Sequence, residues 1–300
     1  MKRTKRVLGL ALAAVMCMGM LANSDTAYAA SGTETSEKVL NIATIGETTT
    51  LSPLYMIADN RPTQKLLYEG LVKYVDGEIK PVLAEDWKLS EDGTQLTFYL
   101  RKGVTFHDGE SFNAEAAIAN IESWHVNPSF TSLPGVVNYT NIEAVDEYTI
   151  RLTYDTPYFA YINDFCWPDV CTMISPKQIT QGDFQTVNGY AGTGPYIYDE
   201  YVAGQYTTFV RNENYWGEQP YYDKIVAKYI PDNASRVQAL KTGEIDLIYG
   251  SAELSYEDYN QATAIDGIEG KFAPSGSTVR NIILNFNGNL SDLSVRQALA

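Results

Sequence analysis

The sequence predicts an α/β fold built on a mixed sheet, and two patterns carry this prediction. Apolar residues alternate with polar ones in short segments, as at Leu96, Phe98 and Leu100, which is typical of half-buried strands. Further along, a strand at Lys224–Ile230 is followed by a helix and by a short apolar strand at Ile245–Tyr249. A strand, a helix and a strand in succession indicate a mixed sheet with helices packed against it.

The N-terminus has the pattern of a cleavable export signal. Four cations within Met1–Arg6 precede an uncharged apolar run from Val7 to Leu21, and Ala27-Tyr28-Ala29 follows. An apolar run of about 15 residues is shorter than the roughly 20 that a membrane-spanning helix needs. We therefore expect residues 1–29 to be a signal peptide, residues 30–38 to be a flexible linker, and the protein to be periplasmic, cell-surface or extracellular.

Lipid attachment at Cys17 is the competing hypothesis for this segment. The residues before it, Ala14-Val15-Met16, lack the small residue usually found directly before a lipid-modified cysteine. Cleavage after Ala29 is favoured.

The elements of the first half follow in order. Proline at Pro53 breaks regular structure after the first strand, and Leu66, Leu67 and Leu71 then recur at helical spacing. Turns are expected at Glu91-Asp92-Gly93 and His107-Asp108-Gly109. The expected elements are a strand at Val39–Ile45, a helix at Arg61–Val72, a hairpin around Trp87 and Leu96–Leu100, a helix capped by Asn113, and a strand at Asp146–Tyr154.

The second half begins with a hairpin. Gly192-Thr193-Gly194-Pro195 opens it, with arms at Tyr196–Tyr201 and Gln205–Arg211. After the strand at Lys224–Ile230, a helix with Val237 and Leu240 inward is expected to stop at Gly243. Residues 292–300 have the pattern of a helix start that is cut off, which suggests a fragment of a longer protein.

Charge and cysteine content exclude some function classes. The net charge is -15 and the basic signal makes the mature chain more negative still, so nucleic-acid binding, which needs clustered Lys and Arg, is disfavoured. After cleavage Cys166 and Cys171 remain. They could close a small disulfide loop or be two buried free thiols, and the sequence leaves both open.

Motifs for catalysis or metal binding are weak. Pro195 follows Gly192-Thr193-Gly194 where a phosphate loop needs a helix with free amides, so a hairpin is favoured. His107 beside Asp108 is typical of a turn rather than of acid–base chemistry. With His107 and His125 as the only histidines and no zinc-type spacing, a metal held mainly by side chains is disfavoured, and any metal is expected to arrive already chelated. A pair of Asp and Glu carboxylates in a glycosidase-like site stays open.

Four segments carry a specific resemblance, and they occur in a fixed order. They are Tyr68–Val72, Trp87–Gly109, Gly192–Gly217 and Leu240–Asp246, and Val295–Leu299 continues the match. Together they resemble the family 5 extracytoplasmic solute-binding proteins of ABC importers, which include oligopeptide-, dipeptide- and nickel-binding proteins. Arg211–Glu218, Glu115–Ala117 and Asp246–Gly250 resemble the nickel-binding branch in particular.

This resemblance implies a two-lobed, periplasmic-binding-protein-like fold of type II with the ligand between the lobes. Residues 39–249 would form lobe 1, with an inserted subdomain at about 72–179, and residues 250–300 would begin a lobe 2 that is largely absent from this chain. Closure of the lobes would remove the ligand from water and signal to the permease. No catalysis and no cofactor are implied, apart from nickel carried as a chelate.

The resemblance also implies ligand-binding residues. Tyr55, Met56 and Arg61 belong to a loop that resembles the ligand-contacting loop of the family, Trp167 and Asp169 lie on the loop near Cys166, and Tyr249 would lie near the hinge. The nickel branch carries an arginine a few residues before Ile-x-Pro, and none stands before Ile174-Ser175-Pro176. Arg61 could supply that charge to a carboxylate-rich chelate, or it could be a surface arginine.

The sequence therefore predicts a monomeric solute-binding protein that delivers a nickel chelate or a short peptide to ABC permease subunits. A dedicated oligopeptide or dipeptide receptor of the same family is the first alternative. A secreted hydrolase that uses an Asp/Glu pair is the more distant one.

Overall fold

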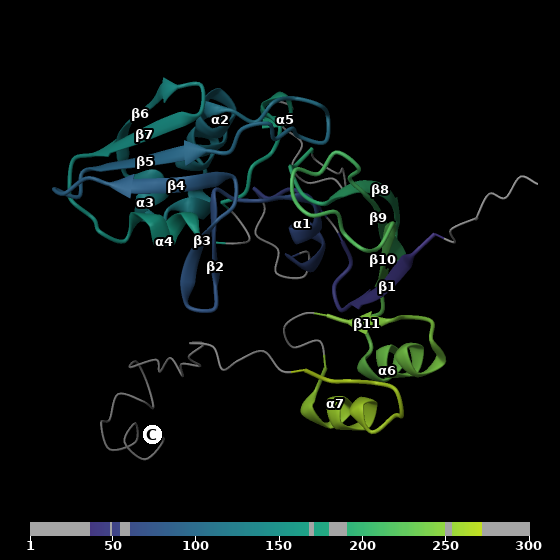
Figure 1. Ribbon diagram of the computed structural model, residues 1–300. Helices are drawn as coiled ribbons and strands as arrows, with labels where there is room; N and C mark the ends of the chain where they lie inside the picture. The colour runs from purple at the N-terminus through teal and green to yellow at the C-terminus, as the bar shows by residue number, and fades with distance from the viewer. Residues whose placement is uncertain are drawn as a thin grey trace, which may run out of the picture. The chain divides into compact units, whose positions relative to one another are not determined.

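A computed structural model of the protein describes residues 37–48, 50–54, 61–167, 171–179, 191–249 and 254–271. Within these residues the strands form a five-stranded, a four-stranded and a two-stranded sheet, accompanied by helices (Figure 1). The expected α/β class is confirmed. The predicted signal peptide and the predicted C-terminal helix at 292–300 lie outside the described residues. In the part that is described, no helix is long and apolar enough to cross a membrane.

The five-stranded sheet is mixed, as the strand–helix–strand pattern predicts. Its order is β11-β1-β10-β9-β8. β1 runs parallel to both β10 and β11, whereas β10, β9 and β8 are antiparallel neighbours. The strands are β1 (Val39–Thr44), β8 (Tyr196–Val202), β9 (Tyr206–Arg211), β10 (Lys224–Tyr229) and β11 (Leu247–Ile248). The sheet thus contains the predicted hairpin, and its last strand is shorter than expected.

Helix α6 (Asn233–Thr242) makes the crossover between the parallel strands β10 and β11. The Asp232 carboxylate accepts a hydrogen bond from the Ser235 N–H at 2.8 Å, and Gly243 ends the helix with φ 73°. Its fully buried side chains are Arg236 and Ala239, so the inward face is rotated from the predicted Val237 and Leu240, which are half-buried. Helix α7 (Tyr256–Thr263) packs on α6, and the Asn233 amide donates to Asp258 at 3.1 Å.

The four-stranded antiparallel sheet has the order β4-β5-β7-β6. Leu96, Phe98 and Leu100 are buried on one face of it, as their alternation predicts. Its strands are β4 (Ala84–Leu89), β5 (Gln95–Leu100), β6 (Tyr139–Asp146) and β7 (Thr149–Tyr154). The prediction of one strand over Asp146–Tyr154 is wrong in part, because Asp146 ends β6. That edge strand is mostly exposed and bulged, so it lacks a strict apolar alternation.

Helices cover the buried face of this sheet. The longest, α2 (Ala114–His125), begins as predicted at Asn113, whose side chain accepts the Ala116 N–H at 3.0 Å. Trp124 on this helix stacks on Phe130 with ring centroids 5.8 Å apart. The shorter helices are η2 (Pro128–Phe130), α3 (Pro134–Val137), α4 (Tyr161–Phe165) and α5 (Pro176–Ile179).

The prediction of a helix over Arg61–Val72 is wrong at its C-terminal end. Helix α1 (Arg61–Leu67) stops earlier, because Gly70 forms a β-bridge with Thr172 and the chain then enters strand β2 (Val72–Val75). β2 pairs with β3 (Glu78–Pro81) through a turn at Asp76-Gly77, where both residues have positive φ. A single buried apolar cluster includes residues of both larger sheets, among them Phe98 and Phe209.

Candidate functional site

Two of the six predicted ligand-binding residues have described side chains. Trp167 follows α4 and is 43% exposed, and Tyr249 follows β11 and is 51% exposed. No hydrogen bond or ring contact joins these two described side chains to each other. Tyr55, Met56 and Asp169 lie outside the described residues, as does the side chain of Arg61, the first residue of α1. The structure therefore describes the supports of the predicted site rather than the site itself.

The stem of the first predicted loop is held by buried polar side chains. Ser52 accepts two hydrogen bonds, one from the Gln64 amide to its carbonyl oxygen at 2.9 Å and one from the Leu54 N–H to its hydroxyl at 3.3 Å. The Asn127 amide reaches the Leu54 carbonyl at 3.5 Å. These bonds join the residues before the loop to α1 and to the residues that follow α2. The backbone on either side of the Tyr55–Arg61 loop is therefore held in place.

The second predicted loop starts and ends at two buried cysteines. Both are free thiols, which decides between the two alternatives left open by the sequence. The Cys166 thiol donates to the Ile162 carbonyl at 3.3 Å, and the Cys171 thiol donates to the Asp164 carbonyl at 3.4 Å. Both thiols thus contact the backbone of α4. Burial raises the pKa of Cys166 to about 11 and that of Cys171 well above its usual value, so both are unreactive near neutral pH.

Asn120 fixes the segment that follows this loop. Its side chain accepts the Ile174 N–H at 3.0 Å and donates to the Ile174 carbonyl at 2.9 Å, and it also donates to the Ala116 carbonyl. The residue is fully buried. A neutral amide both donates and accepts, so it can hydrogen-bond both the N–H and the carbonyl of a backbone stretch outside any sheet. Asn120 thereby joins α2 to residues 173–175.

Glu69 is the centre of a second polar cluster, which the sequence analysis did not single out. Its carboxylate accepts hydrogen bonds from the Trp216 indole at 2.7 Å, the Tyr215 hydroxyl at 2.8 Å and the Thr193 hydroxyl at 3.0 Å. Burial raises the pKa of Glu69, and these donors oppose that rise. The Arg101 guanidinium lies over the Trp216 ring at 4.5 Å from its centroid. The partners of Glu69 lie 124 to 147 positions away in the sequence, so no local pattern marked this residue.

The Gly192-Thr193-Gly194 segment passes through a tight junction. A Cβ atom on Gly192 would lie 2.0 Å from the Leu67 carbonyl oxygen, and one on Gly194 would lie 2.6 Å from the Leu66 carbonyl oxygen. Glycine is therefore required at both positions for close backbone approach. His107, from the predicted turn, contacts the same segment from another side. The segment opens a hairpin, as predicted, and it is not a phosphate loop.

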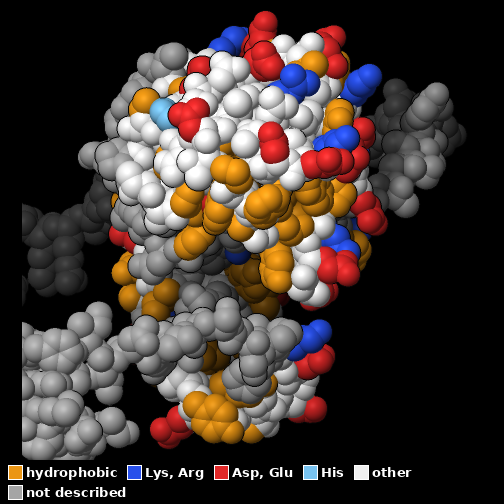
Figure 2. Space-filling model, turned by 90° about the vertical axis from the view of Figure 1, so that its left-hand side faces the viewer, with side chains coloured by type: hydrophobic (Ala, Val, Ile, Leu, Met, Phe, Trp, Pro, Cys, Tyr) orange, Lys and Arg blue, Asp and Glu red, His pale blue; other side chains and the backbone are white. Residues whose placement is uncertain are grey.

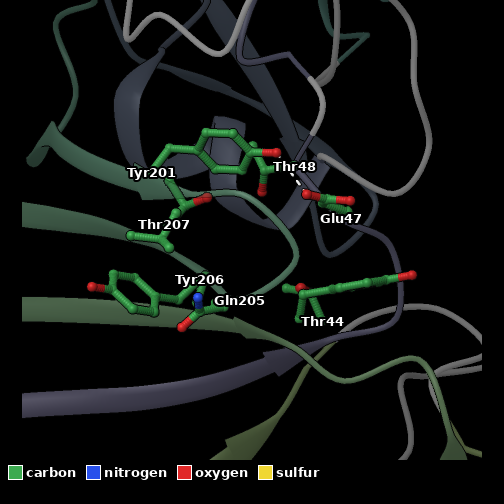
Figure 3. A pocket seen from close by; sticks show the side chains of 10 residues that line it. Thr44, Glu47, Thr48, Tyr201, Gln205, Tyr206 and Thr207 are labelled. Atoms are coloured by element: carbon green, nitrogen blue, oxygen red, sulfur yellow. Dashed lines mark hydrogen bonds between the residues drawn. The ribbon is translucent and has the colours of Figure 1, made fainter.

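A small hollow lies at the carboxyl ends of the parallel strands β1 and β10 (Figure 3). Glu47, Tyr201 and Gln205 are among the residues that line it. Glu47 accepts hydrogen bonds from the Tyr201 hydroxyl and the Gly204 N–H, both at 2.6 Å, and the Tyr201 bond lowers its pKa. The glutamate thus connects the loop after β1 to the β8–β9 turn.

The described surface offers no pre-formed metal centre. In the residues that the structure describes, no group of three or more His, Cys, Asp and Glu side chains could hold a metal ion.

One face of the molecule, shown in Figure 2, carries a band of hydrophobic side chains beside acidic ones. Trp167 and Tyr249 are both among the large hydrophobic residues exposed at the described surface.

The fold and these sequence motifs match known proteins. A family model described as bacterial extracellular solute-binding proteins, family 5 (middle), matches residues 78–300. The nickel-binding periplasmic protein of Escherichia coli (strain K12) is 38% identical over 209 residues, which are 68% of this chain and 40% of the relative. The glutathione-binding protein GsiB of Pectobacterium atrosepticum is 34% identical over 219 residues, 69% of this chain and 41% of the relative.

A solved structure agrees with these matches. NikA from Brucella suis, in complex with Fe(III)-EDTA, superposes with a TM-score of 0.67 at 33% identity, over 75% of this chain and 46% of that one. The fold is accordingly that of a type II periplasmic binding protein, of which this chain carries a part. The chain belongs to the family 5 extracellular solute-binding proteins. It spans about 40% of the length of the relatives that it matches.

Proposed function

We propose that this protein is the ligand-binding component of an ABC importer, which captures a nickel chelate or a short peptide outside the cytoplasm and delivers it to the permease subunits. The observation that carries the proposal is the match to the E. coli nickel-binding periplasmic protein, which is stronger than the match to the glutathione-binding one. The nickel chelate is therefore the first ligand to test. Glutathione is itself a short peptide, so that second match supports the peptide alternative.

The proposed binding residues are those on the three segments singled out from the sequence. Tyr55, Met56 and Arg61 would contact the ligand from the first loop, Trp167 and Asp169 from the second, and Tyr249 from the hinge side. The hydrogen bonds of Ser52, Asn127 and Asn120 support this assignment, because they fix the backbone on which the two loops are mounted. The partial exposure of Trp167 also supports its assignment to the ligand-binding residues.

A thermal-shift panel on the complete, export-processed protein tests the ligand class. A ligand that binds the native state raises the melting temperature in proportion to the logarithm of its concentration above its dissociation constant. We expect the largest shift with nickel plus histidine and little shift with nickel alone. A shift with a pool of short peptides alone would favour the peptide receptor.

The same preparation tests the hydrolase alternative. The proposal requires binding without turnover, so a panel of glycoside and peptide substrates should be recovered intact after incubation. Release of product by the pure protein would overturn the proposal in favour of a secreted hydrolase.

A further inference from the structure

His107 forms three hydrogen bonds to the Gly192–Gly194 segment. Its backbone N–H donates to the Gly192 carbonyl at 2.9 Å. Its Nδ1 atom lies 3.2 Å from the Gly192 nitrogen, and its Nε2 atom lies 3.0 Å from the Gly194 carbonyl oxygen. A carbonyl oxygen only accepts and a backbone N–H only donates, so Nε2 must carry the proton and Nδ1 must be bare. The contacts select one neutral tautomer.

Protonation of the ring removes this fit. An imidazolium carries N–H groups on both nitrogens, so the proton on Nδ1 would point at the Gly192 N–H, donor against donor. The Gly194 contact would survive, because Nε2 remains a donor. One of the two ring bonds is thus lost and replaced by a repulsive contact.

The glycine segment cannot retreat from His107. On its other side both glycines lie directly against the carbonyl groups of Leu66 and Leu67, and the Gly194 N–H donates to the Leu67 carbonyl at 2.9 Å. The Asn212 amide also donates to the Gly194 carbonyl at 3.0 Å. A charged His107 therefore has to move away with its own turn, because the backbone of residues 192–194 is held in place.

We propose that His107 is a proton-operated latch, which in its neutral form fastens the turn between β5 and α2 to the segment leading into β8, and which opens when the ring is protonated. Partial burial of the ring supports this, because it lowers the pKa of His107, whereas the Gly194 bond and Asp108 oppose that effect. The inference is independent of the proposed ligand.

Other charged groups surround the latch. Asp108 and Glu110 lie on the same turn, Lys177 of α5 pairs with Glu110, and Glu69 reaches the segment through Thr193. Glu69 has a raised pKa, so it contributes to pH-dependent stability with the opposite sign to His107. The contribution of His107 must therefore be measured as a difference between variants and not from the wild type alone.

The direction in which His107 makes stability depend on pH follows from the difference between its pKa values in the folded and unfolded states. Its pKa is lower in the folded protein than in the unfolded chain, so between the two values the unfolded state binds more protons. The stabilisation is complete above the unfolded pKa of about 6.5 and is lost as the pH falls toward the folded pKa. Each pH unit inside this window lowers the folding equilibrium constant by up to about tenfold.

The chain has two histidines, which provides a matched control. Urea unfolding of the complete protein would be compared between about pH 7.5 and about pH 5 for wild type, His107→Gln and His125→Gln. His125 is exposed at the end of α2, where its ring lies against that of Tyr139 with centroids 4.6 Å apart. We expect the free energy of unfolding of His125→Gln to fall on acidification as much as that of the wild type. That of His107→Gln should fall much less. Equal acid dependence in all three proteins would overturn the latch.

A second measurement covers the case in which His107→Gln does not fold. Ring ¹⁵N NMR of the wild type should show His107 at about pH 7 as the neutral tautomer with the proton on Nε2. Hydrogen exchange of the Gly192 and His107 amides, whose hydrogen bonds join the two segments, should accelerate at about pH 5, after correction for intrinsic rates, relative to a segment of the β8–β9 sheet. The opposite tautomer, or exchange that rises equally everywhere, would contradict the proposal.

Discussion

The indole N–H of Trp216 donates a hydrogen bond of 2.7 Å to the carboxylate of Glu69, although the two residues are 147 positions apart in the sequence. The same carboxylate accepts the Thr193 hydroxyl, and Thr193 lies between the two glycines that pack against α1. A single side chain thus joins the end of α1, the segment before β8 and the loop after β9.

Removing the charge of Glu69 should destabilise this junction. In Glu69→Gln an NH₂ group, which only donates, replaces one of the two accepting oxygens, so at least one donor of the cluster loses its acceptor and we expect a loss of about 2 kcal/mol in the free energy of unfolding. Urea denaturation of the variant against wild type measures it. Glu91→Gln, in an exposed turn, is the control and should be neutral. Equal stability of the two variants would show that the three hydrogen bonds contribute little.

Asn120 offers a test of the other support. In Asn120→Ala the Ile174 N–H and carbonyl lose their partners in a buried site, and we expect a loss of about 3 kcal/mol in the free energy of unfolding. The exposed Asn141→Ala in β6 is the matched control. If ligand loops depend on this support, ligand affinity of the Asn120 variant falls as well, whereas a change confined to stability would separate the two roles.

Glycine is required at position 192 because there is no room for a side chain, and not because the backbone there has a positive φ. In Gly192→Ala the new methyl group would lie 2.0 Å from a carbonyl oxygen of the backbone, which cannot yield, so we expect a loss of about 3 kcal/mol or failure to fold. Gly103→Asn is a useful contrast: Gly103 has φ 75° with open space around it, and asparagine tolerates that conformation. A small loss of stability in Gly192→Ala together with a large loss in Gly103→Asn would contradict this explanation.

The two cysteines should behave as protected thiols. Because both are buried and their pKa values are raised, a thiol reagent at about pH 8 should modify Cys166 and Cys171 slowly in the native mature protein and label both after unfolding without reductant. Absence of labelling in the unfolded, unreduced protein would reveal a disulfide. Fast labelling of the native protein would show that the loop between them opens readily.

The sequence predicts much of this structure where apolar alternation and local capping decide the element. The Leu96–Leu100 strand, the Asn113 cap and the Gly243 stop follow from contacts within a few residues, and all three are confirmed. β6 and the end of α1 could not be predicted in the same way, because a bulged edge strand and the bridge between Gly70 and Thr172 depend on residues distant in sequence.

In the candidate site, too, features set by neighbouring residues were predictable, and features set by residues distant in the sequence were not. The turn at His107 was predictable from Asp-Gly chemistry, but the ring's partners at Gly192 and Gly194 are 85 and 87 positions away and leave no local signal. Glu69 and Asn120 were missed for the same reason. The six predicted ligand residues stay a prediction, because their side chains are either outside the described residues or described without a partner that defines a pocket.

The ligand assignment predicts a specific loss of affinity. A guanidinium facing a carboxylate-rich chelate forms charge-assisted hydrogen bonds, so Arg61→Ala combined with Asp169→Ala should weaken binding by more than about tenfold. Arg151→Ala, whose arginine pairs with Glu143 on the four-stranded sheet, is the control and should bind as wild type does. An unchanged dissociation constant in the double variant would remove Arg61 and Asp169 from the site.

The most direct test of the proposed function is calorimetric titration of the complete, export-processed protein with nickel plus histidine, with nickel alone as the paired experiment. The proposal predicts saturable, tight binding of one chelate per chain in the first titration and no comparable heat in the second. Saturable heat from a pool of short peptides, with none from the chelate, would make the protein a peptide receptor of the same family. Absence of binding in every titration would contradict the assignment as the ligand-capturing component of an importer.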